Sequence, residues 1–229
     1  LTHWRDTLAV FDTETTGLDT RHARIVTCFL GIIGPDGEVQ ESHSWLADPG
    51  VDIPEQATAV HGVTTEMARE QGRSAPDVVR EIGDTVGGYL ASGLPVVAYN
   101  AVYDFSILHH EMVRYDIAPL LDPRPIIDPL VIDRAVDTYR KGKRTLGMAA
   151  AHYLVALDDS HRADADAIAA GRVAQAILRQ HEETLTGDAQ WLHDQQIEWA
   201  DAWAENYQKF RRGSGDPSFV ASGAWPVRR

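Results

Sequence analysis

The stretch that most constrains this chain is AVFDTETTGLD, Ala9 to Asp19, in which an apolar run ends on two acids. Alternate residues of a β-strand point to the same face, so Asp12 and Glu14 project together. Two carboxylates about 4 Å apart repel by roughly 4 kcal/mol at an effective dielectric of 20. A fold tolerates that repulsion when a cation lies between the acids, or when the strand end is open to solvent. The pattern therefore indicates either a divalent-cation site or an exposed strand end.

A third acid follows a second buried strand. LPVVAYN is short and apolar, and it leads into AVYDFSILHHEMVRY, which has helical spacing. We expect the side chain of Asn100 to cap this helix, and Asp104 to lie one turn further on, facing the strand ends. Open α/β sheets place their sites at those strand ends. The alternative is a first-turn acid that only complements the helix dipole.

The segment DDSHRADADA supplies a fourth acid at the start of another predicted helix. Asp164 and Asp166 are about 200° apart on a helix, so at most one of them faces the sheet. Steps of three or four residues from Asp166 give an apolar stripe, Ala170, Val173 and Ile177. We therefore assign Asp166 to the site and Asp164 to the helix dipole.

The order of strand and helix patterns defines the fold class. Three sequential strands, 7–14, 24–33 and 38–47, predict an antiparallel meander, and short apolar runs predict strands at 94–100 and 126–127. Helical spacing predicts helices over these ranges: 75–92, 101–115, from 129, from about 161 to 180, and 189–212. The prediction is an α/β fold with a mixed five-stranded sheet flanked by helices, and an extra C-terminal helix.

Composition argues against several classes of protein. No run approaches the roughly 20 apolar residues of a membrane span, and the stretch LTHWRDTLAVFD lacks the pattern of a secretory signal, so we expect a cytoplasmic protein. Cys28 is the single cysteine and lies in an apolar strand, which predicts a buried thiol. The net charge of −13 argues against a protein that coats nucleic acid electrostatically.

Three of these motifs together resemble one family. FDTETTG, NAVYDFSIL and HRADADA, in this order, are similar to the three exonuclease motifs of the DnaQ-like DEDD nucleases, which have a ribonuclease-H-like fold. The resemblance implies that two Mg²⁺ or Mn²⁺ ions bind to four acids: Asp12, Glu14, Asp104 and Asp166. Position 162 is Arg and position 161 is His, which matches the histidine subtype of the family. By resemblance, His161 is the general base.

The implied chemistry is consistent with these residue types. Carboxylate ligands without a thiolate suit hard cations. Two such ions can activate water and stabilise the leaving 3′-oxygen of a phosphodiester, and a histidine can take the proton of the water near neutrality. Bound cations also reverse the local field, which weakens the objection raised by the net charge.

Residues expected to contact the substrate are assigned by resemblance as well. Thr15 and Thr16 would lie near the terminal nucleotide, Leu18 would pack against its base, and His61 would lie near the last sugar or base. The alternative for His61 is a solvent-exposed loop position. Asn100 completes the predicted substrate-binding set, which is Thr15, Thr16, Leu18, His61 and Asn100. The basic run Lys141 to Arg144 would either contact an upstream phosphate or form a solvated loop.

The resemblance divides the chain into an exonuclease domain, 6–182, and a C-terminal helical extension with an irregular tail, 183–229. Aromatic residues of the last helix form a stripe that would pack on its own domain, contact a protein partner or a second copy, or stack on bases.

The leading hypothesis is a 3′→5′ exonuclease that releases nucleoside 5′-monophosphates from single-stranded DNA ends. The alternatives are an exoribonuclease of the RNase T or oligoribonuclease type, a catalytically silent nucleic-acid-binding module, and a metal-dependent phosphatase acting on small substrates.

Overall fold

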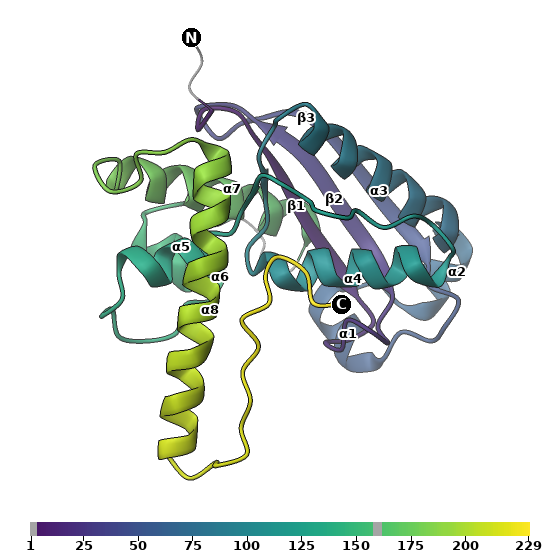
Figure 1. Ribbon diagram of the computed structural model, residues 1–229. Coiled ribbons are helices and arrows are strands. Elements are labelled where there is room, and N and C mark those ends of the chain that lie inside the picture. The colour runs from purple at the N-terminus through teal and green to yellow at the C-terminus, as the bar shows by residue number, and fades with distance from the viewer. Residues whose placement is uncertain (1–3, 158–161) are drawn as a thin grey trace.

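The computed structural model describes residues 4–157 and 162–229 and has a central sheet covered by helices (Figure 1). The sheet holds six strands in the order β4-β3-β2-β1-β5-β6. The strands are β1 (Leu8–Thr15), β2 (Ile25–Ile33), β3 (Val39–Asp48), β4 (Arg73–Ser74), β5 (Val96–Val97) and β6 (Ile126–Ile127). The helices are α1 (Glu55–His61), α2 (Thr65–Gln71), α3 (Ala75–Ala91), α4 (Ala101–Arg114), α5 (Pro129–Val136), α6 (Leu146–His152), α7 (Ala163–Gln180) and α8 (Ala189–Gly213).

The sheet is mixed, as the sequence predicts. β1, β2 and β3 form an antiparallel meander, while β5 pairs parallel to β1 and β6 pairs parallel to β5. The five predicted strands are all present. The sixth, β4, pairs parallel to the end of β3 and has only two residues, too few to show any alternation in sequence.

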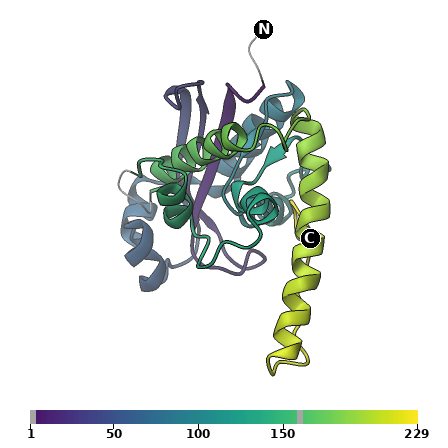
Figure 2. The same ribbon diagram turned by 90° about the vertical axis from the view of Figure 1, so that its left-hand side faces the viewer.

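The alternation along β1 separates two hydrophobic cores. Ala9 and Phe11 belong to the core under α3 and α4, whereas Leu8 and Val10 belong to the core under α7. Figure 1 shows α3 and α4 on one side of the sheet, and Figure 2 shows α7 crossing the other side. The C-terminal end of β1 thus lies between the layers that carry α4 and α7.

Gly171 lets α7 lie close to the sheet. A Cβ atom at this position would lie 2.4 Å from Cγ1 of Val10 and 2.6 Å from Cδ1 of Ile33. Such separations are far shorter than van der Waals contact, so any side chain here would push the helix away. The predicted apolar stripe of Ala170, Val173 and Ile177 is buried against the same face.

The C-terminal segment packs against the edge of the sheet through α8, and the tail after α8 then runs back toward α4 (Figure 1). α8 begins at its cap, Asp188, packs beside β6 and α5, and extends past the body of the molecule (Figures 1 and 2). The segment after α8 has no helix or strand, as predicted, yet it runs back toward α4 and buries Trp225 at 8% exposure. The tail is therefore irregular in secondary structure and fixed by packing.

The aromatic stripe of α8 is divided between buried and exposed positions. Leu192 is buried and Trp199 packs against both cores, while Tyr207 contacts Phe219 of the returning tail at a ring distance of 5.4 Å. Phe210, at 65% exposure, lies free of the core, and a partner or dimer contact through α8 stays a prediction centred on it.

Two other predictions concern burial. Cys28 is buried in β2, and burial, together with the charges of Asp12 and Asp104, raises the pKa of its thiol well above the usual range. Among the helices of residues 4–157 and 162–229, none has the length and hydropathy needed to cross a membrane.

Candidate active site

The end of β1 is held to the start of α4 by one carboxylate. Asp104 is 3% exposed, and its Oδ1 accepts hydrogen bonds from the backbone N–H of Thr13 at 3.0 Å and from the hydroxyl of Thr13 at 2.7 Å. Thr13 lies on β1 between Asp12 and Glu14, so the two acids of the strand and the acid of the helix are fixed relative to one another. The prediction that Asp104 faces the strand ends is confirmed.

The fourth acid comes from α7. The charge of Asp166 acts on both Asp12 and Glu14, which places its carboxylate beside theirs. Asp164 instead pairs with Arg162 at 2.9 Å on the outer side of the helix. The structure therefore selects Asp166 over Asp164, as the apolar stripe of the helix predicts.

Burial and mutual repulsion shift the pKa values of these acids. Burial, followed by the charges of Asp104, Glu14 and Asp166, raises the pKa of Asp12 well above its usual range. Burial and then Asp166 raise the pKa of Glu14 to about 7. Burial raises the pKa of Asp104 to about 7, although the two hydrogen bonds from Thr13 oppose that rise.

Among residues 4–157 and 162–229, no ion pair joins Asp12, Glu14 or Asp104 to a basic side chain. Carboxylates buried together without a cation hold protons or bind a metal. The cluster is thus electrostatically incomplete on its own.

The donor set fits a hard divalent cation. It consists of carboxylate oxygens alone, the ligands that Mg²⁺ and Mn²⁺ prefer. Within the described residues, no three His, Cys, Asp or Glu side chains are drawn together tightly enough to form a coordination sphere as they stand. The carboxylate donors and their negative charge therefore favour a cation at this site. The arrangement of these ligands around a bound ion stays a prediction.

His161 lies outside the described residues, so its predicted role as general base stays a prediction. Arg162, which follows it, caps α7 from an extended conformation, and the helix itself begins at Ala163. The predicted start near position 161 is thus two residues early.

The turn after β1 places the predicted substrate-binding threonines. The Thr15 hydroxyl donates to the carbonyl of Gly17 at 2.8 Å and also contacts the hydroxyl of Tyr103, which itself donates to Gly17 at 2.7 Å. The Thr16 hydroxyl accepts from the backbone N–H of Arg24 at 2.9 Å. These bonds hold the turn in place beside the acids.

Leu18 and His61 belong to the predicted substrate-binding set, and their contacts with a substrate stay a prediction. Leu18 is 90% exposed, so its side chain is accessible to a ligand, although singly exposed apolar side chains are common on protein surfaces. His61 ends α1, and its Nδ1 accepts from the backbone N–H of Val63 at 3.2 Å. Burial lowers the pKa of His61, and the backbone of Thr15 counteracts that effect. His61 is therefore a half-buried neighbour of Thr15, and the exposed-loop alternative is wrong.

The capping prediction for Asn100 is wrong. Its side chain makes no cap hydrogen bond, and its backbone is left-handed with φ 64°, a conformation that asparagine tolerates well. Asp128 caps α4 instead: its two carboxylate oxygens accept from the backbone N–H groups of Asn100 and Ala101, each at 2.9 Å. Asp128 also caps α5 through the N–H of Leu130 at 3.0 Å.

Asp128 and Tyr103 support the site and are missing from the predicted set. The pair Asp128–Pro129 has the pattern of a helix start, which indicates the cap of α5 but not that of α4. Tyr103 directly precedes Asp104, and burial raises its pKa to about 12. Nothing in the local sequence indicates that its hydroxyl reaches back to the turn after β1.

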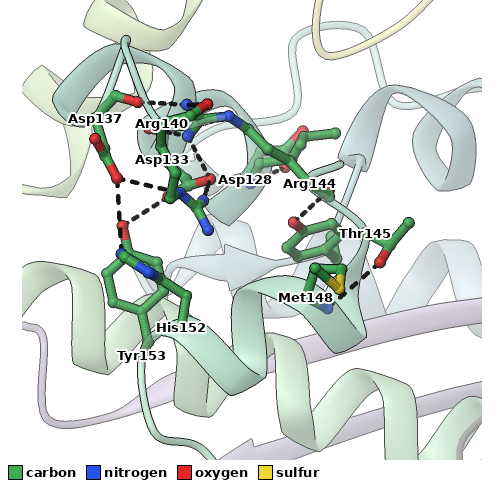
Figure 3. Close-up of polar contacts among 11 residues, drawn as sticks. Asp128, Asp133, Asp137, Arg140, Arg144, Thr145, Met148, His152 and Tyr153 are labelled. Carbon is green, nitrogen blue, oxygen red and sulfur yellow. Dashed lines mark hydrogen bonds and ion pairs between the residues drawn. The ribbon is translucent and has the colours of Figure 1, made fainter. Parts of the chain in front are cut away.

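The basic run splits between two roles. Arg144 donates to Asp133 Oδ2 at 2.8 Å and to the carbonyl of Asp133 at 2.9 Å, inside a network that also contains Arg140 and Tyr153 (Figure 3). Arg144 is thus committed to the protein interior. Lys141 and Lys143 are exposed, as expected for a solvated loop.

Comparison with known proteins decides the family. The family model described as "Exonuclease" matches residues 9–174, the region that holds β1, α4 and the acid-bearing part of α7. The chain belongs to the exonuclease family. The resemblance to DnaQ-like exonucleases is thereby confirmed, and with it the ribonuclease-H-like α/β fold.

Curated relatives are much longer than this chain. It is 28% identical over 171 residues to a PolC-type DNA polymerase III of Lacticaseibacillus paracasei, covering 75% of this chain and 11% of the relative. A PolC-type DNA polymerase III of Clostridium perfringens is 28% identical over 181 residues, covering 79% and 12%. The chain therefore spans about a tenth of the length of these relatives.

Solved structures of exonucleases share the fold. Exonuclease I of E. coli, in complex with a dA16 oligonucleotide, superposes with a TM-score of 0.67 at 17% identity, covering 78% of this chain and 42% of that one. Exonuclease X, in complex with 5′ overhanging duplex DNA, gives a TM-score of 0.57 at 21% identity, covering 81% and 99%.

Proposed function

We propose that this protein is a metal-dependent 3′→5′ exonuclease that hydrolyses phosphodiesters at the 3′ end of a single strand and releases nucleoside 5′-monophosphates. The observation that carries the proposal is the gathering of four acids at the end of β1: Asp104 is hydrogen-bonded to Thr13 between Asp12 and Glu14, and the charge of Asp166 acts on both acids of the strand. Membership of the exonuclease family supports the same reaction.

Four side chains would hold two divalent cations, Mg²⁺ or Mn²⁺: Asp12, Glu14, Asp104 and Asp166. When bound, the ions supply positive charge that favours attack of water on phosphorus and departure of the 3′-oxygen. Thr13 holds Asp104 in position through its N–H and hydroxyl, so that this ligand is oriented before any ion binds.

His161 is the proposed general base. A histidine titrates near pH 6.5, so a neutral imidazole is available near pH 7 to take a proton from the attacking water. The new P–O bond forms at the water oxygen, the bond to the 3′-oxygen breaks, and the phosphate leaves on the released nucleotide.

The substrate proposed is single-stranded DNA, with RNA as the alternative. Solved exonuclease I structures contain single-stranded deoxyoligonucleotides, dA16 and dT13, which favours DNA for a chain of this fold. Leu18, exposed beside the turn that holds Thr15, supplies the apolar surface on which a terminal base would pack. An RNA substrate would use the same acids.

The test is digestion of 5′-labelled single-stranded DNA and RNA of one sequence in the presence of Mn²⁺. Wild type should give a ladder that shortens from the 3′ end, and Asp166→Ala should abolish it. Asp164→Ala is the matched control, because this acid lies on the same helix turn but pairs with Arg162 on the outside. His161→Ala should leave Mn²⁺ binding intact and remove most of the rate.

The outcomes separate the competing functions. A faster ladder on DNA or on RNA identifies the substrate class. Mn²⁺ binding by calorimetry with no ladder on either polymer points to a small phosphoester substrate. The absence of both binding and hydrolysis would support the silent nucleic-acid-binding module. Equal activity of Asp166→Ala and Asp164→Ala would contradict the four-acid assignment.

A further inference from the structure

A pocket of about 300 Å³ lies between α5, α8 and the returning tail. Its walls include Arg134 of α5, Trp203 and Asn206 of α8, Trp225 of the tail, and Asn100 at the start of α4. Most of these walls come from residues after 174, outside the part of the chain that matches the exonuclease family. The pocket is therefore a feature of this chain's own C-terminal segment.

Arg134 is the charged group of the pocket. Its guanidinium carbon lies 3.9 Å from the ring centre of Trp203, and that ring stacks on Tyr207 at 4.9 Å. The aromatic pair holds the guanidinium in one orientation, which lowers the entropic cost of binding an anion with it.

No carboxylate in the described chain forms an ion pair with Arg134, and none of the hydrogen bonds found there uses its guanidinium as donor. Asp128 lines the same pocket, yet its two oxygens accept from backbone N–H groups and from the indole of Trp225 at 3.3 Å. Burial is also the main influence on the pKa of Arg134, which it lowers. A half-buried guanidinium with free donors indicates that an anion belongs beside it.

The pocket and the four-acid cluster both adjoin the start of α4. Asn100 and Val102 line the pocket, while Tyr103 contacts the turn after β1 and Asp104 contacts Thr13. Residues two to four positions apart at a helix start have Cα atoms roughly 6 Å from one another, so the two sites are neighbours. A strand whose 3′ end lies at the acids can therefore reach the pocket within a few nucleotides.

We propose that this pocket binds a phosphodiester of the substrate strand upstream of the scissile bond, with the guanidinium of Arg134 as its phosphate ligand. The inference rests on the proposed function, because the acids mark where the 3′ end lies. It also accounts for substrate capture by a chain with a net charge of −13: the strand is held by cations at one point and by Arg134 at another.

The test compares substrate lengths with Arg134→Gln and with Arg80→Gln. Arg80 lies exposed on α3, so the control changes the net charge equally at a distance from the pocket. For Arg134→Gln, the ratio of kcat/KM on a strand of about ten nucleotides to that on a dinucleotide should fall about tenfold. The salt slope of log Kd for the longer strand should also fall by about one. Arg80→Gln should change neither quantity.

A second variant and a binding assay keep the inference independent of folding and of catalysis. Arg134→Lys keeps the charge and loses the flat stack on Trp203, so it should retain the salt slope and lose part of the affinity. Fluorescence anisotropy with a labelled strand in EDTA measures binding without hydrolysis. If wild type binds through Arg134 but hydrolyses neither polymer, the proposed function fails and the binding site stands.

Three results would overturn the inference. One is hydrolysis by wild type with an unchanged length ratio and affinity in Arg134→Gln. Another is an equal loss on dinucleotide and long strand, which would mean a structural role for Arg134. The third is Arg134-dependent binding of a free nucleoside monophosphate with no such dependence for the strand, which would assign the pocket to a mononucleotide.

Discussion

The carboxylates at the end of β1 and the carboxylate of Asp133 in α5 are compensated in opposite ways. At the end of β1, Asp12 and Asp104 are surrounded by other acids, and their pKa values are raised. In α5, the equally buried Asp133 is surrounded by donors (Figure 3).

The Asp133 centre is complete without any ligand. Arg144 donates at 2.8 Å and the Tyr153 hydroxyl at 2.6 Å, while Arg140 forms a further ion pair with the same carboxylate. Buried charge with such partners fixes the local structure. Here it holds α5, the loop after it and α6 together. At the end of β1, by contrast, Asp12, Glu14 and Asp104 have no basic side chain as an ion-pair partner among the described residues, so the kind of compensation distinguishes the structural acid from the acids of the candidate site.

The largest expected difference concerns activity. Asp104→Asn keeps the acceptor for Thr13 but removes a charged ligand, so kcat should fall by at least about 10⁴-fold, equivalent to roughly 5 kcal/mol. Asp133→Asn, the same substitution in the structural centre, should leave kcat per folded molecule within about threefold of wild type. Single-turnover digestion of a labelled strand measures both values. Comparable losses of kcat in the two variants would contradict the distinction between the acids of the candidate site and the structural acid Asp133.

The same two variants should reverse their order in stability. Asp133→Asn leaves two guanidinium groups facing a neutral amide, so the free energy of unfolding should fall by about 3–5 kcal/mol. Asp104→Asn relieves repulsion and, without divalent cations at pH 8, should raise it by about 1–2 kcal/mol. Urea denaturation followed by circular dichroism measures these changes. A destabilised Asp104→Asn would mean that the acid cluster is compensated.

The pH dependence sharpens the comparison. The folded pKa values of Glu14, Asp104 and Asp128, about 7, 7 and 6, lie above their ordinary values, so the folded state keeps protons that the unfolded state has lost. Without divalent cations, the contribution of these three groups to the free energy of unfolding should therefore be largest below about pH 4. It should fall as the pH rises to about 7, by roughly 3 kcal/mol for each of these groups taken alone.

The control for this pH effect is the metal itself. Saturating Mn²⁺ binds the ionised acids, so it should stabilise the protein increasingly as the pH rises and reverse the slope. Thermal unfolding across the pH range, with EDTA or with Mn²⁺, measures both slopes. A flat profile in EDTA would contradict the raised pKa values.

A smaller effect is expected where α7 approaches the sheet. Gly171→Ala places a Cβ against Val10 and Ile33, so α7 should shift, at a cost of about 1–3 kcal/mol, and carry Asp166 away from Asp12. Gly88→Ala in α3 is the matched control: its Cβ meets nothing within 4 Å and should stabilise the helix by up to about 1 kcal/mol. Urea denaturation and kcat measure the pair. Normal kcat in Gly171→Ala would show that Asp166 tolerates the shift.

The smallest effect concerns the Asp128 cap. Trp225→Phe keeps an aromatic ring but removes the indole N–H that donates to Asp128, and it should cost about 1 kcal/mol. Urea denaturation measures that loss. Trp191→Phe, at a half-buried position in the first turn of α8, is the control for losing an indole elsewhere. A cost for Trp225→Phe no greater than for Trp191→Phe would show that the bond contributes nothing.

The sequence predicts the features that depend on local order. The ends of β1 and α4, the choice of Asp166 over Asp164, and the mixed sheet all follow from periodicity and from the spacing of acids. These signals lie within a few residues of what they specify.

The features that the sequence misses depend on distant partners. Asn100 has the pattern of a cap, yet the cap is a carboxylate 28 positions later. Arg144 sits in a basic run that resembles a surface loop, and only the folded structure brings Asp133 to it. The pairing of β4 likewise depends on the end of β3, since two residues carry no pattern of their own.

The returning tail has a consequence for the order in which the molecule assembles. Trp225 reaches Asp128 across 97 positions, and the backbone N–H of Arg228 reaches the Ser106 hydroxyl across 122. Contacts of such sequence separation close large loops and form after local helices and hairpins. During synthesis, therefore, the helix that carries Asp104 emerges long before the chain that completes its cap. The acid cluster reaches its final rigidity only after the ribosome has added that later segment.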